Sequence, residues 1–303
     1  MYLLDLHGGN ARVVMVAAQH CRIETVTEHR VEAVVRGKLR NQPDFSLAVG
    51  DVVTADSYGD HWMIESVAPR RSEFVREGLR RQRQVLFANA DRVLILASLA
   101  QPQTKIASLD RFLVAALKGQ TPPVLVLTKT DMDEDGAHAR TLTDLYAVQN
   151  IPVFPVCNVT GEGVAAVADA LRTGLSALVG NSGVGKTSLL NRLIPGLDLR
   201  VREVSAWSGK GTHTTSSALM FPFGDHAALI DTPGMKSFVP FGVSRDNLIE
   251  LFPDLQNAAA GCRFSDCRHL SEPECAVLAA VARGELPESR LRSYHRLHED
   301  LPR

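Results

Sequence analysis

The stretch Gly180-Asn181-Ser182-Gly183-Val184-Gly185-Lys186-Thr187 decides the fold of the central part of this chain. It matches the phosphate-loop pattern GxxxxGK[ST], in which backbone amides wrap around phosphate oxygens at the start of a helix. An apolar run at 176–179 precedes it, and a helical pattern over 186–194 follows. This strand, loop and helix order favours a nucleotide-binding α/β domain with a parallel sheet over a plain glycine-rich turn.

Each position in this loop has a predicted role. The glycines allow the backbone to approach phosphate closely. Lys186 is predicted to reach the β- and γ-phosphates, and the Thr187 hydroxyl is predicted to ligate Mg²⁺. The nucleotide-binding residues predicted in this segment are Gly180, Asn181, Ser182, Gly183, Val184, Gly185, Lys186, Thr187 and Ser188.

A second phosphate-side motif, Asp231-Thr232-Pro233-Gly234, follows the apolar run at 227–230. Asp231 is predicted to hold Mg²⁺ through water, and the Gly234 amide is predicted to sense the γ-phosphate. Many GTPases place a water-orienting glutamine directly after this glycine, whereas this chain has Met235. We therefore expect slow intrinsic turnover that a partner or another residue must accelerate.

The segment Gly209-Lys210-Gly211-Thr212-His213-Thr214-Thr215 lies between these two motifs and is predicted to be a switch loop. Thr215 is preferred over Thr214 as the residue that reaches Mg²⁺ or the γ-phosphate. His213 is a candidate for positioning the attacking water, and a purely structural hydrogen-bonding role for it stays equally open.

The base-reading motif is predicted at Thr128-Lys129-Thr130-Asp131, which resembles the NKxD pattern of GTPases. The Asp131 carboxylate can accept two N–H donors of guanine, a pair that adenine lacks, so GTP is predicted over ATP. Thr128 stands where asparagine is usual. Cys157 and Asn158 open a segment, 157–163, at the place of the fifth, SA-type guanine motif, although neither Ser nor Ala is present.

The order of these motifs indicates a circular permutation. The base-reading motif precedes the phosphate loop, whereas in an ordinary GTPase it follows. Reading from the phosphate loop to the end and wrapping to the start restores the usual cyclic order. A closed cycle can be cut at a surface loop without disturbing a packed sheet.

The segments that flank this domain differ from it in pattern. Short β-rich runs punctuated by glycine turns fill residues 1–68 and predict a small closed barrel, for which an OB-fold is one candidate and another small β-barrel is the alternative. Residues 69–92 hold seven arginines against three acids, which suits an RNA contact and a solvated linker equally well. The predicted domains are 1–68 (barrel), 69–92 (basic linker), 93–245 (permuted GTPase domain) and 246–303 (helical zinc-binding domain).

Metal binding is predicted near the C-terminus, where Cys262, Cys267, His269 and Cys275 follow the spacing C-x4-C-x-H-x5-C. Three thiolates and one imidazole form a closed tetrahedral zinc site, and this composition predicts a structural role. His295 and His298 are predicted to lie on a helix surface. The nearby arginines that are candidates for facing RNA are Arg263, Arg268, Arg283, Arg290, Arg292 and Arg296.

Composition limits the class of protein to which the chain can belong. A net charge of −1 over 303 residues excludes a globally basic nucleic-acid binder, although it allows a local basic patch. Five cysteines, an odd count, argue against a disulfide framework. With no run of eighteen apolar residues and no signal-peptide pattern at the N-terminus, the chain is predicted to be cytoplasmic, off the membrane and monomeric.

Taken in order, these motifs resemble the RsgA (also called YjeQ) family of bacterial GTPases that depend on the small ribosomal subunit. The resemblance rests on Arg36-Gly37-Lys38-Leu39-Arg40 in the barrel, the TKTD-first order, GNSGVGKTS, the HTT switch, DTPG and the cysteine spacing. It implies late maturation of the small subunit, GTP hydrolysis stimulated by that subunit, and rRNA contacts by the barrel and the zinc domain. The family usually has arginine at the position of Thr212.

Two other hypotheses remain open from the residues alone. Met235, Thr128 and Thr212 suit an RNA-binding assembly factor with a weak or vestigial nucleotide site. A phosphate loop is also found in ATP-using enzymes, and such an enzyme would prefer adenine nucleotides. GTP turnover that is lost in a Lys186 variant, and competition between GDP and ADP, distinguish the three.

Overall fold

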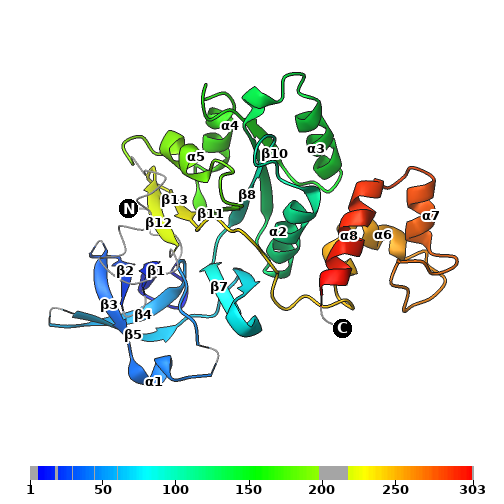
Figure 1. Cartoon of the computed structure of the whole chain (residues 1–303). Helices are drawn as coiled ribbons and strands as arrows, with labels where there is room; N and C mark the ends of the chain where they lie inside the picture. Colours follow the sequence, from blue (N-terminus) through cyan, green and yellow to red (C-terminus); the bar gives the residue numbers. More distant parts are fainter. Residues whose placement is uncertain are drawn as a thin grey trace.

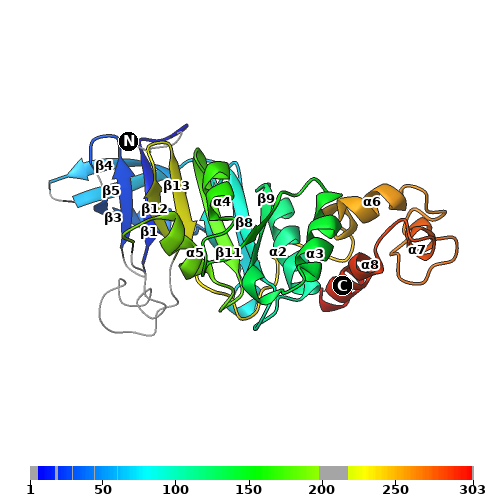
Figure 2. The ribbon, with the colours of Figure 1, turned by 90° about the horizontal axis from the view of Figure 1, so that it is seen from above.

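A computed structural model describes residues 6–17, 20–28, 30–43, 45–59, 61–197 and 218–301 of the chain. Three parts follow one another in space in the order of the sequence: a β-barrel, an α/β sheet and a group of helices (Figures 1 and 2). No described helix combines the length and the apolar character needed to cross a lipid bilayer.

The N-terminal part is a closed five-stranded barrel, which confirms the predicted architecture. Its strand order is β1-β2-β3-β5-β4, and a second pairing of β1 with β4 closes it. The parallel pair β3–β5 and the antiparallel pair β1–β4 match the OB-fold arrangement. The elements are β1 (Ala11–Val16), β2 (Cys21–Thr25), β3 (Val31–Val35), α1 (Gly37–Arg40), β4 (Val52–Tyr58) and β5 (His61–Val67).

A β-hairpin occupies much of the segment predicted as a basic linker. It consists of β6 (Glu73–Glu77) and β7 (Arg83–Ala88), joined through a 3-10 turn at Leu79–Arg81. The rings of Phe74 and Phe87 stack at 5.1 Å and are fully buried in the same core as one face of the central sheet. The hairpin therefore packs against the central domain, and this packing fixes the positions of its arginines.

The central sheet carries the order β10-β9-β8-β11-β13-β12, with β12 as its antiparallel member. Apolar residues alternate between its faces, so that α2 and α3 cover one core and α4 and α5 cover the other. The bounds are β8 (Arg92–Ser98), α2 (Ile106–Lys118), β9 (Pro123–Thr128), η2 (Thr130–Met132), α3 (Ala137–Ala147), β10 (Val153–Val156), α4 (Val164–Ala170), β11 (Gly174–Gly180), α5 (Lys186–Leu193), β12 (Leu219–Phe223) and β13 (Ala227–Asp231).

The strand order of this sheet explains how the permuted motifs come together. The strand that carries the phosphate loop, β11, lies between β8, which precedes it in sequence, and β13, which follows it. Because β9 and β11 run parallel to β8, their carboxyl ends reach the same edge of the sheet. The sheet also continues into the barrel, through a single pairing of Met15 on β1 with Leu219 on β12.

The C-terminal part is helical and has its own small core, in which the rings of Phe252 and Tyr294 meet edge to face at 5.5 Å. The prediction that His298 lies on the surface is wrong, because it falls on the buried face of α8 with Tyr294 and Leu297. The elements are η4 (Ile249–Leu251), α6 (Pro253–Ala259), α7 (Ala276–Ala282) and α8 (Glu288–Asp300).

Arg290 of α8 joins this part to the central domain. Its side chain is 2% exposed and lies between Asp110 of α2 and Asp254 of α6. Burial alone would lower the pKa of Arg290, but the two carboxylates outweigh it and raise that pKa. The prediction that Arg290 faces RNA is therefore wrong, since an arginine paired inside a domain junction cannot contact a nucleic acid.

Candidate nucleotide site and metal centre

The phosphate loop connects β11 to α5, which begins at Lys186. Gly183 and Gly185 have φ values of +81° and +95°, in the left-handed region that favours glycine. A Cβ on Gly185 would lie 2.9 Å from Nδ2 of Asn158, at the movable end of that side chain, so the left-handed backbone is the main reason for glycine here. The loop thus presents the backbone arrangement that the sequence motif requires for binding phosphate.

The DTPG segment is paired with the phosphate loop through the backbone. The Ser182 amide donates to the Met235 carbonyl, and the Met235 amide donates to the Gly180 carbonyl, each at 3.2 Å. A Cβ added to Gly234 would lie 3.5 Å from Nζ of Lys186. The glycine predicted to sense the γ-phosphate therefore lies beside the lysine predicted to bind it.

Two buried charges of opposite sign face this site. Burial lowers the pKa of Lys186, and the charge of Asp231 partly offsets that effect. Burial raises the pKa of Asp231 to about 6, and Lys186 opposes it. Each group is held in surroundings that disfavour its charge, so phosphate binding at the lysine and cation binding near the carboxylate would both be favoured.

Met235 belongs to the same buried core as Phe238 and is 3% exposed. A side chain packed there cannot orient a water molecule, which agrees with its apolar chemistry. The switch candidates Thr212, His213, Thr214 and Thr215 lie outside the described residues.

The base-reading loops are tied to the phosphate loop by side chains. Oγ1 of Thr128 donates to the Val184 carbonyl at 2.6 Å, and Nδ2 of Asn158 donates to the Gly185 carbonyl at 3.2 Å. Thr128 is fully buried. A threonine hydroxyl thus makes a contact between the two loops without the amide group of the usual asparagine.

Cys157 contacts the residue predicted to read the base. Its thiol donates to Oδ1 of Asp131 at 3.3 Å, and its sulfur accepts the Thr160 amide at the same distance. The thiol is almost fully buried, whereas Asp131 is exposed at the mouth of the site. Sequence reasoning placed Cys157 in this site by position alone and missed its contact with Asp131.

The remaining predicted nucleotide-binding residues lie around the same edge. Nδ2 of Asn181 donates to Oγ of Ser108 on α2 at 3.0 Å, which joins the phosphate loop to that helix. Ser182 and Ser188 are exposed, Thr187 and Thr130 are half-buried, and half-buried Lys129 has a left-handed backbone with φ of +61°.

Three cysteines and one histidine converge in the C-terminal part, as their spacing predicted. One ligand atom from each of Cys262, Cys267, His269 and Cys275 lies within 4.8 Å of all the others. Nδ1 of His269 is 3.5 Å from the sulfurs of Cys262 and Cys275. In a tetrahedron with Zn–S bonds of about 2.3 Å, neighbouring ligands lie about 3.8 Å apart, so this group fits zinc.

Supporting contacts hold the metal loop in shape. The Glu272 carboxylate accepts backbone N–H groups of Arg268, Leu270 and Ser271. Burial would raise the pKa of Glu272, but these bonds lower it to about 2. On α8, His295 lies 2.7 Å from the His269 carbonyl, so the helix that carries Arg290 also supports the cysteine group.

Comparison with known proteins decides the family. A family model described as RsgA GTPase matches residues 67–240. The small ribosomal subunit biogenesis GTPase RsgA of Gemmatimonas aurantiaca is 37% identical over 287 residues, which cover 92% of this chain and 93% of the relative. This chain belongs to the RsgA GTPase family. The protein of the same name from Bacteroides fragilis is 34% identical over 288 residues, which cover 92% and 93% of the two chains.

The similarity to solved structures extends over all three parts of the chain. The crystal structure of YjeQ from Thermotoga maritima has a TM-score of 0.78 at 30% identity and covers 97% of this chain and 98% of its own. The structure of YloQ, described as a circularly permuted GTPase, has a TM-score of 0.72 at 22% identity over 97% and 96%, and shows the same fold. The predicted permutation is thereby confirmed.

Proposed function

We propose that this RsgA-family chain is a GTPase that acts in biogenesis of the small ribosomal subunit, hydrolysing GTP to GDP and phosphate. The observation that carries the proposal is the pairing of the DTPG segment with the phosphate loop, which brings Gly234 beside Lys186. The names of its relatives support the ribosomal part of the proposal.

In the proposed reaction, Lys186 and the loop amides bind the phosphates and stabilise the charge that develops during transfer. Thr187 and Asp231 would hold Mg²⁺, which neutralises phosphate charge when bound. Water attacks the γ-phosphorus, the bond to the bridging oxygen breaks, and GDP leaves. Thr215 and His213 are proposed to complete the site from the switch loop.

Guanine selection is proposed to depend on Asp131 together with Cys157. The thiol hydrogen bond orients the carboxylate toward the two N–H donors of guanine. We expect GDP to compete with labelled GTP far better than ADP does. Cys157→Ala should weaken GDP binding about tenfold, which corresponds to loss of one hydrogen bond, and Cys157→Ser should restore it. Preference for ADP would reject this assignment.

Zinc is proposed to be structural, because all four ligands come from the protein and leave no open position. The proposed partner is the small subunit with its rRNA, contacted by the barrel and the C-terminal domain. Exposed arginines of that domain, such as Arg292 and Arg296, remain available for such contacts, whereas Arg290 does not.

The test is steady-state GTP turnover by the full chain with and without purified small subunits. With Met235 in the core, we expect slow turnover alone and strong stimulation by the subunits. Lys186→Ala should abolish both rates while the melting temperature and the circular dichroism spectrum stay close to wild type. Turnover that ignores the subunits would remove the ribosomal part of the proposal.

A second candidate function is an RNA-binding assembly factor with a weak nucleotide site. Burial of Met235 favours it, because the methionine at the usual water-orienting position cannot orient a water molecule. Turnover above background that disappears in Lys186→Ala would eliminate this candidate. Subunit binding without any turnover would favour it.

A further inference from the structure

A cavity of about 610 Å³ lies where the barrel, the β6–β7 hairpin and the segment after DTPG meet. Its walls come from 46–49 at the barrel, from 83–86 on β7, and from Pro233 to Ser237. No residue of the phosphate loop lines it. The cavity is therefore separate from the nucleotide site, although both share the segment that contains Gly234.

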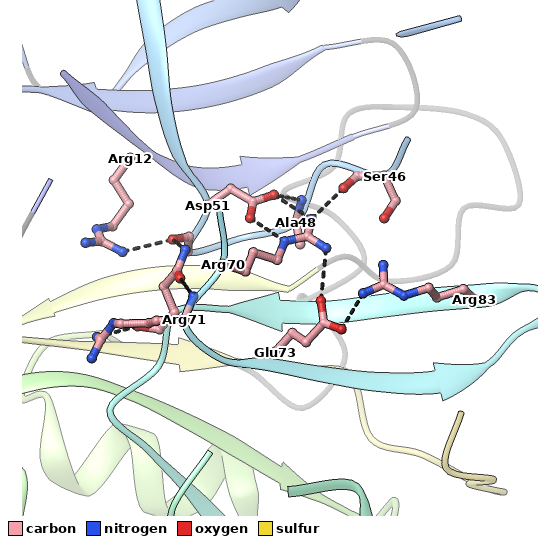
Figure 3. A network of polar contacts seen from close by, with 10 residues as sticks. Arg12, Ser46, Ala48, Asp51, Arg70, Arg71, Glu73 and Arg83 are labelled. Carbon is pink, nitrogen blue, oxygen red and sulfur yellow. Dashed lines mark hydrogen bonds and ion pairs between the residues drawn. The ribbon is translucent and has the colours of Figure 1, made fainter. Parts of the chain in front are cut away.

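The lining of this cavity is positively charged. Arg76, Arg83 and Lys236 line it, and none of the described lining residues is an aspartate or glutamate. Arg83 is paired with Glu73, which belongs to the network that fastens the hairpin to the barrel (Figure 3). In the same network Arg70 binds Asp51 at 2.7 Å. The carboxylates of the junction thus hold the scaffold together.

Arg76 differs from these paired arginines. Its Nε donates to the side chain of Gln84 at 2.9 Å, and within the described ranges no carboxylate forms an ion pair with it. Burial lowers the pKa of Arg76, and no acid offsets that cost. An anion in the cavity would supply the missing counter-charge. Oγ of Ser46, also in the lining, is buried and has no hydrogen-bond partner among the residues that the structure describes.

The rest of the lining is apolar, with Val16, Leu47, Val49 and Leu86 among its residues. A volume of this size holds a ligand with a flat apolar portion as well as a charged group. Cationic and apolar walls together match one nucleotide unit, whose phosphate binds cations and whose base packs on apolar surface.

The surface beside the cavity favours a ligand that is a chain of nucleotides over a single nucleotide. The hairpin turn carries Arg80 and Arg81, both exposed, and Leu79, which is 91% exposed. These residues lie on the same hairpin as Arg76 and Arg83. A single nucleotide would fill the cavity alone, whereas RNA can extend from the cavity along the hairpin and meet further cations.

We propose that this cavity binds one nucleotide unit of single-stranded RNA, with its phosphate held by Arg76 and Lys236 against the segment that follows Gly234. The inference deepens the proposed ribosomal function and rests on it for the source of the RNA. Binding can be measured without GTP hydrolysis, so failure of the RNA site and failure of the GTPase proposal are distinguishable.

The experiment uses the full chain saturated with GDP and a fluorescent 12-mer of C and U, which lacks guanine and cannot occupy the guanine site. Anisotropy titrations at several salt concentrations give the affinity and its salt dependence. We expect Arg76→Gln to weaken binding about tenfold and to reduce the salt slope by about one. Arg172→Gln, which removes an exposed arginine near the end of α4 and outside the cavity, should leave the affinity unchanged.

A second variant covers the case in which Arg76→Gln disturbs the hairpin. Ser237→Trp fills the cavity from an exposed position without changing charge, and it should also weaken binding about tenfold. Wild-type affinity in both folded variants would overturn the site. Displacement of the 12-mer by an equal nucleotide concentration of UMP would assign the cavity to a free nucleotide and overturn the RNA assignment.

Discussion

The two junctions of the central domain use arginine in opposite ways. At the C-terminal junction, Arg290 is buried between Asp110 and Asp254, and its guanidinium also lies 4.6 Å from the ring centroid of Phe252. At the barrel junction, Arg76 lines an open cavity and binds only the neutral side chain of Gln84 among the described residues. The first arginine is part of the architecture, whereas the second is placed to meet an external anion.

This difference teaches that arginine density alone does not locate an RNA surface. Both residues come from arginine-rich stretches. The two arginines differ in whether a carboxylate lies close enough to form an ion pair. A buried arginine that already has such a partner would have to give it up to bind an external anion, and that costs free energy. The following predictions test the contrast between a closed junction and an open one.

Metal removal should have the largest effect, and it should act on the C-terminal junction only. Structural zinc contributes on the order of 10 kcal/mol to small metal domains. After chelation we expect the amides of α8 to lose hydrogen-exchange protection, because His295 contacts the metal loop. The amides of β6 and β7 should keep theirs. Full protection of α8 in the chelated protein would show that the helix does not depend on the metal.

Replacing the buried cation should be the next largest effect. Arg290→Met leaves two carboxylates buried without a cationic partner and should cost about 3–5 kcal/mol in urea unfolding. Arg292→Met, at an exposed position on the same helix, should change stability by less than about 0.5 kcal/mol. Adding Asp110→Asn and Asp254→Asn to Arg290→Met should recover much of the loss. A loss below about 1 kcal/mol for Arg290→Met alone would contradict the closed-junction description.

A smaller effect is expected at Tyr146, whose hydroxyl donates to Oδ1 of Asp110 at 2.9 Å. Tyr146→Phe removes this bond to a carboxylate and keeps the ring, so it should cost about 1.5 kcal/mol in the same urea assay. Tyr58→Phe, at an exposed position of the barrel, is the matched control and should be neutral. An equal loss of unfolding free energy in both variants would mean that the hydrogen bond to Asp110 does not contribute to stability.

The smallest effect should come from Arg76. Because it has no carboxylate partner within the described part of the chain, Arg76→Ala should change the free energy of unfolding by no more than about 0.5 kcal/mol. The same variant should weaken RNA binding. A large loss of stability would show that Arg76 supports the scaffold and would remove the contrast with Arg290.

Much of the fold could be predicted from local patterns. The apolar runs before each nucleotide motif became β8, β9, β11 and β13, because buried parallel strands are apolar on both faces. The four metal-binding residues lie within fourteen positions, so their spacing carried the prediction. The β6–β7 hairpin was not predicted, because the many arginines of this segment made it look like a polar linker. Its apolar residues Phe74 and Phe87 come together only when the two strands pair.

The remaining features depend on contacts between distant segments. Asp110 and Arg290 are 180 positions apart, and no local pattern pairs them. His298 looked like a surface residue because its neighbours Glu299 and Asp300 are charged, yet the helical period turns it toward Tyr294. The thiol bond from Cys157 to Asp131 was equally hidden, since it joins two loops that approach only at the edge of the finished sheet.

The position of β11 has a consequence for the order in which the chain is made. A ribosome that synthesises this protein releases β8, β9 and β10 before the strand that pairs with the other side of β8 exists. Until residues 174–180 emerge, the nascent chain carries an unpaired edge of β8 that can recruit foreign strands. The relocated cut therefore leaves this edge of β8 unpaired during synthesis, whereas in the unpermuted order the β11 segment would already be present when β8 emerges.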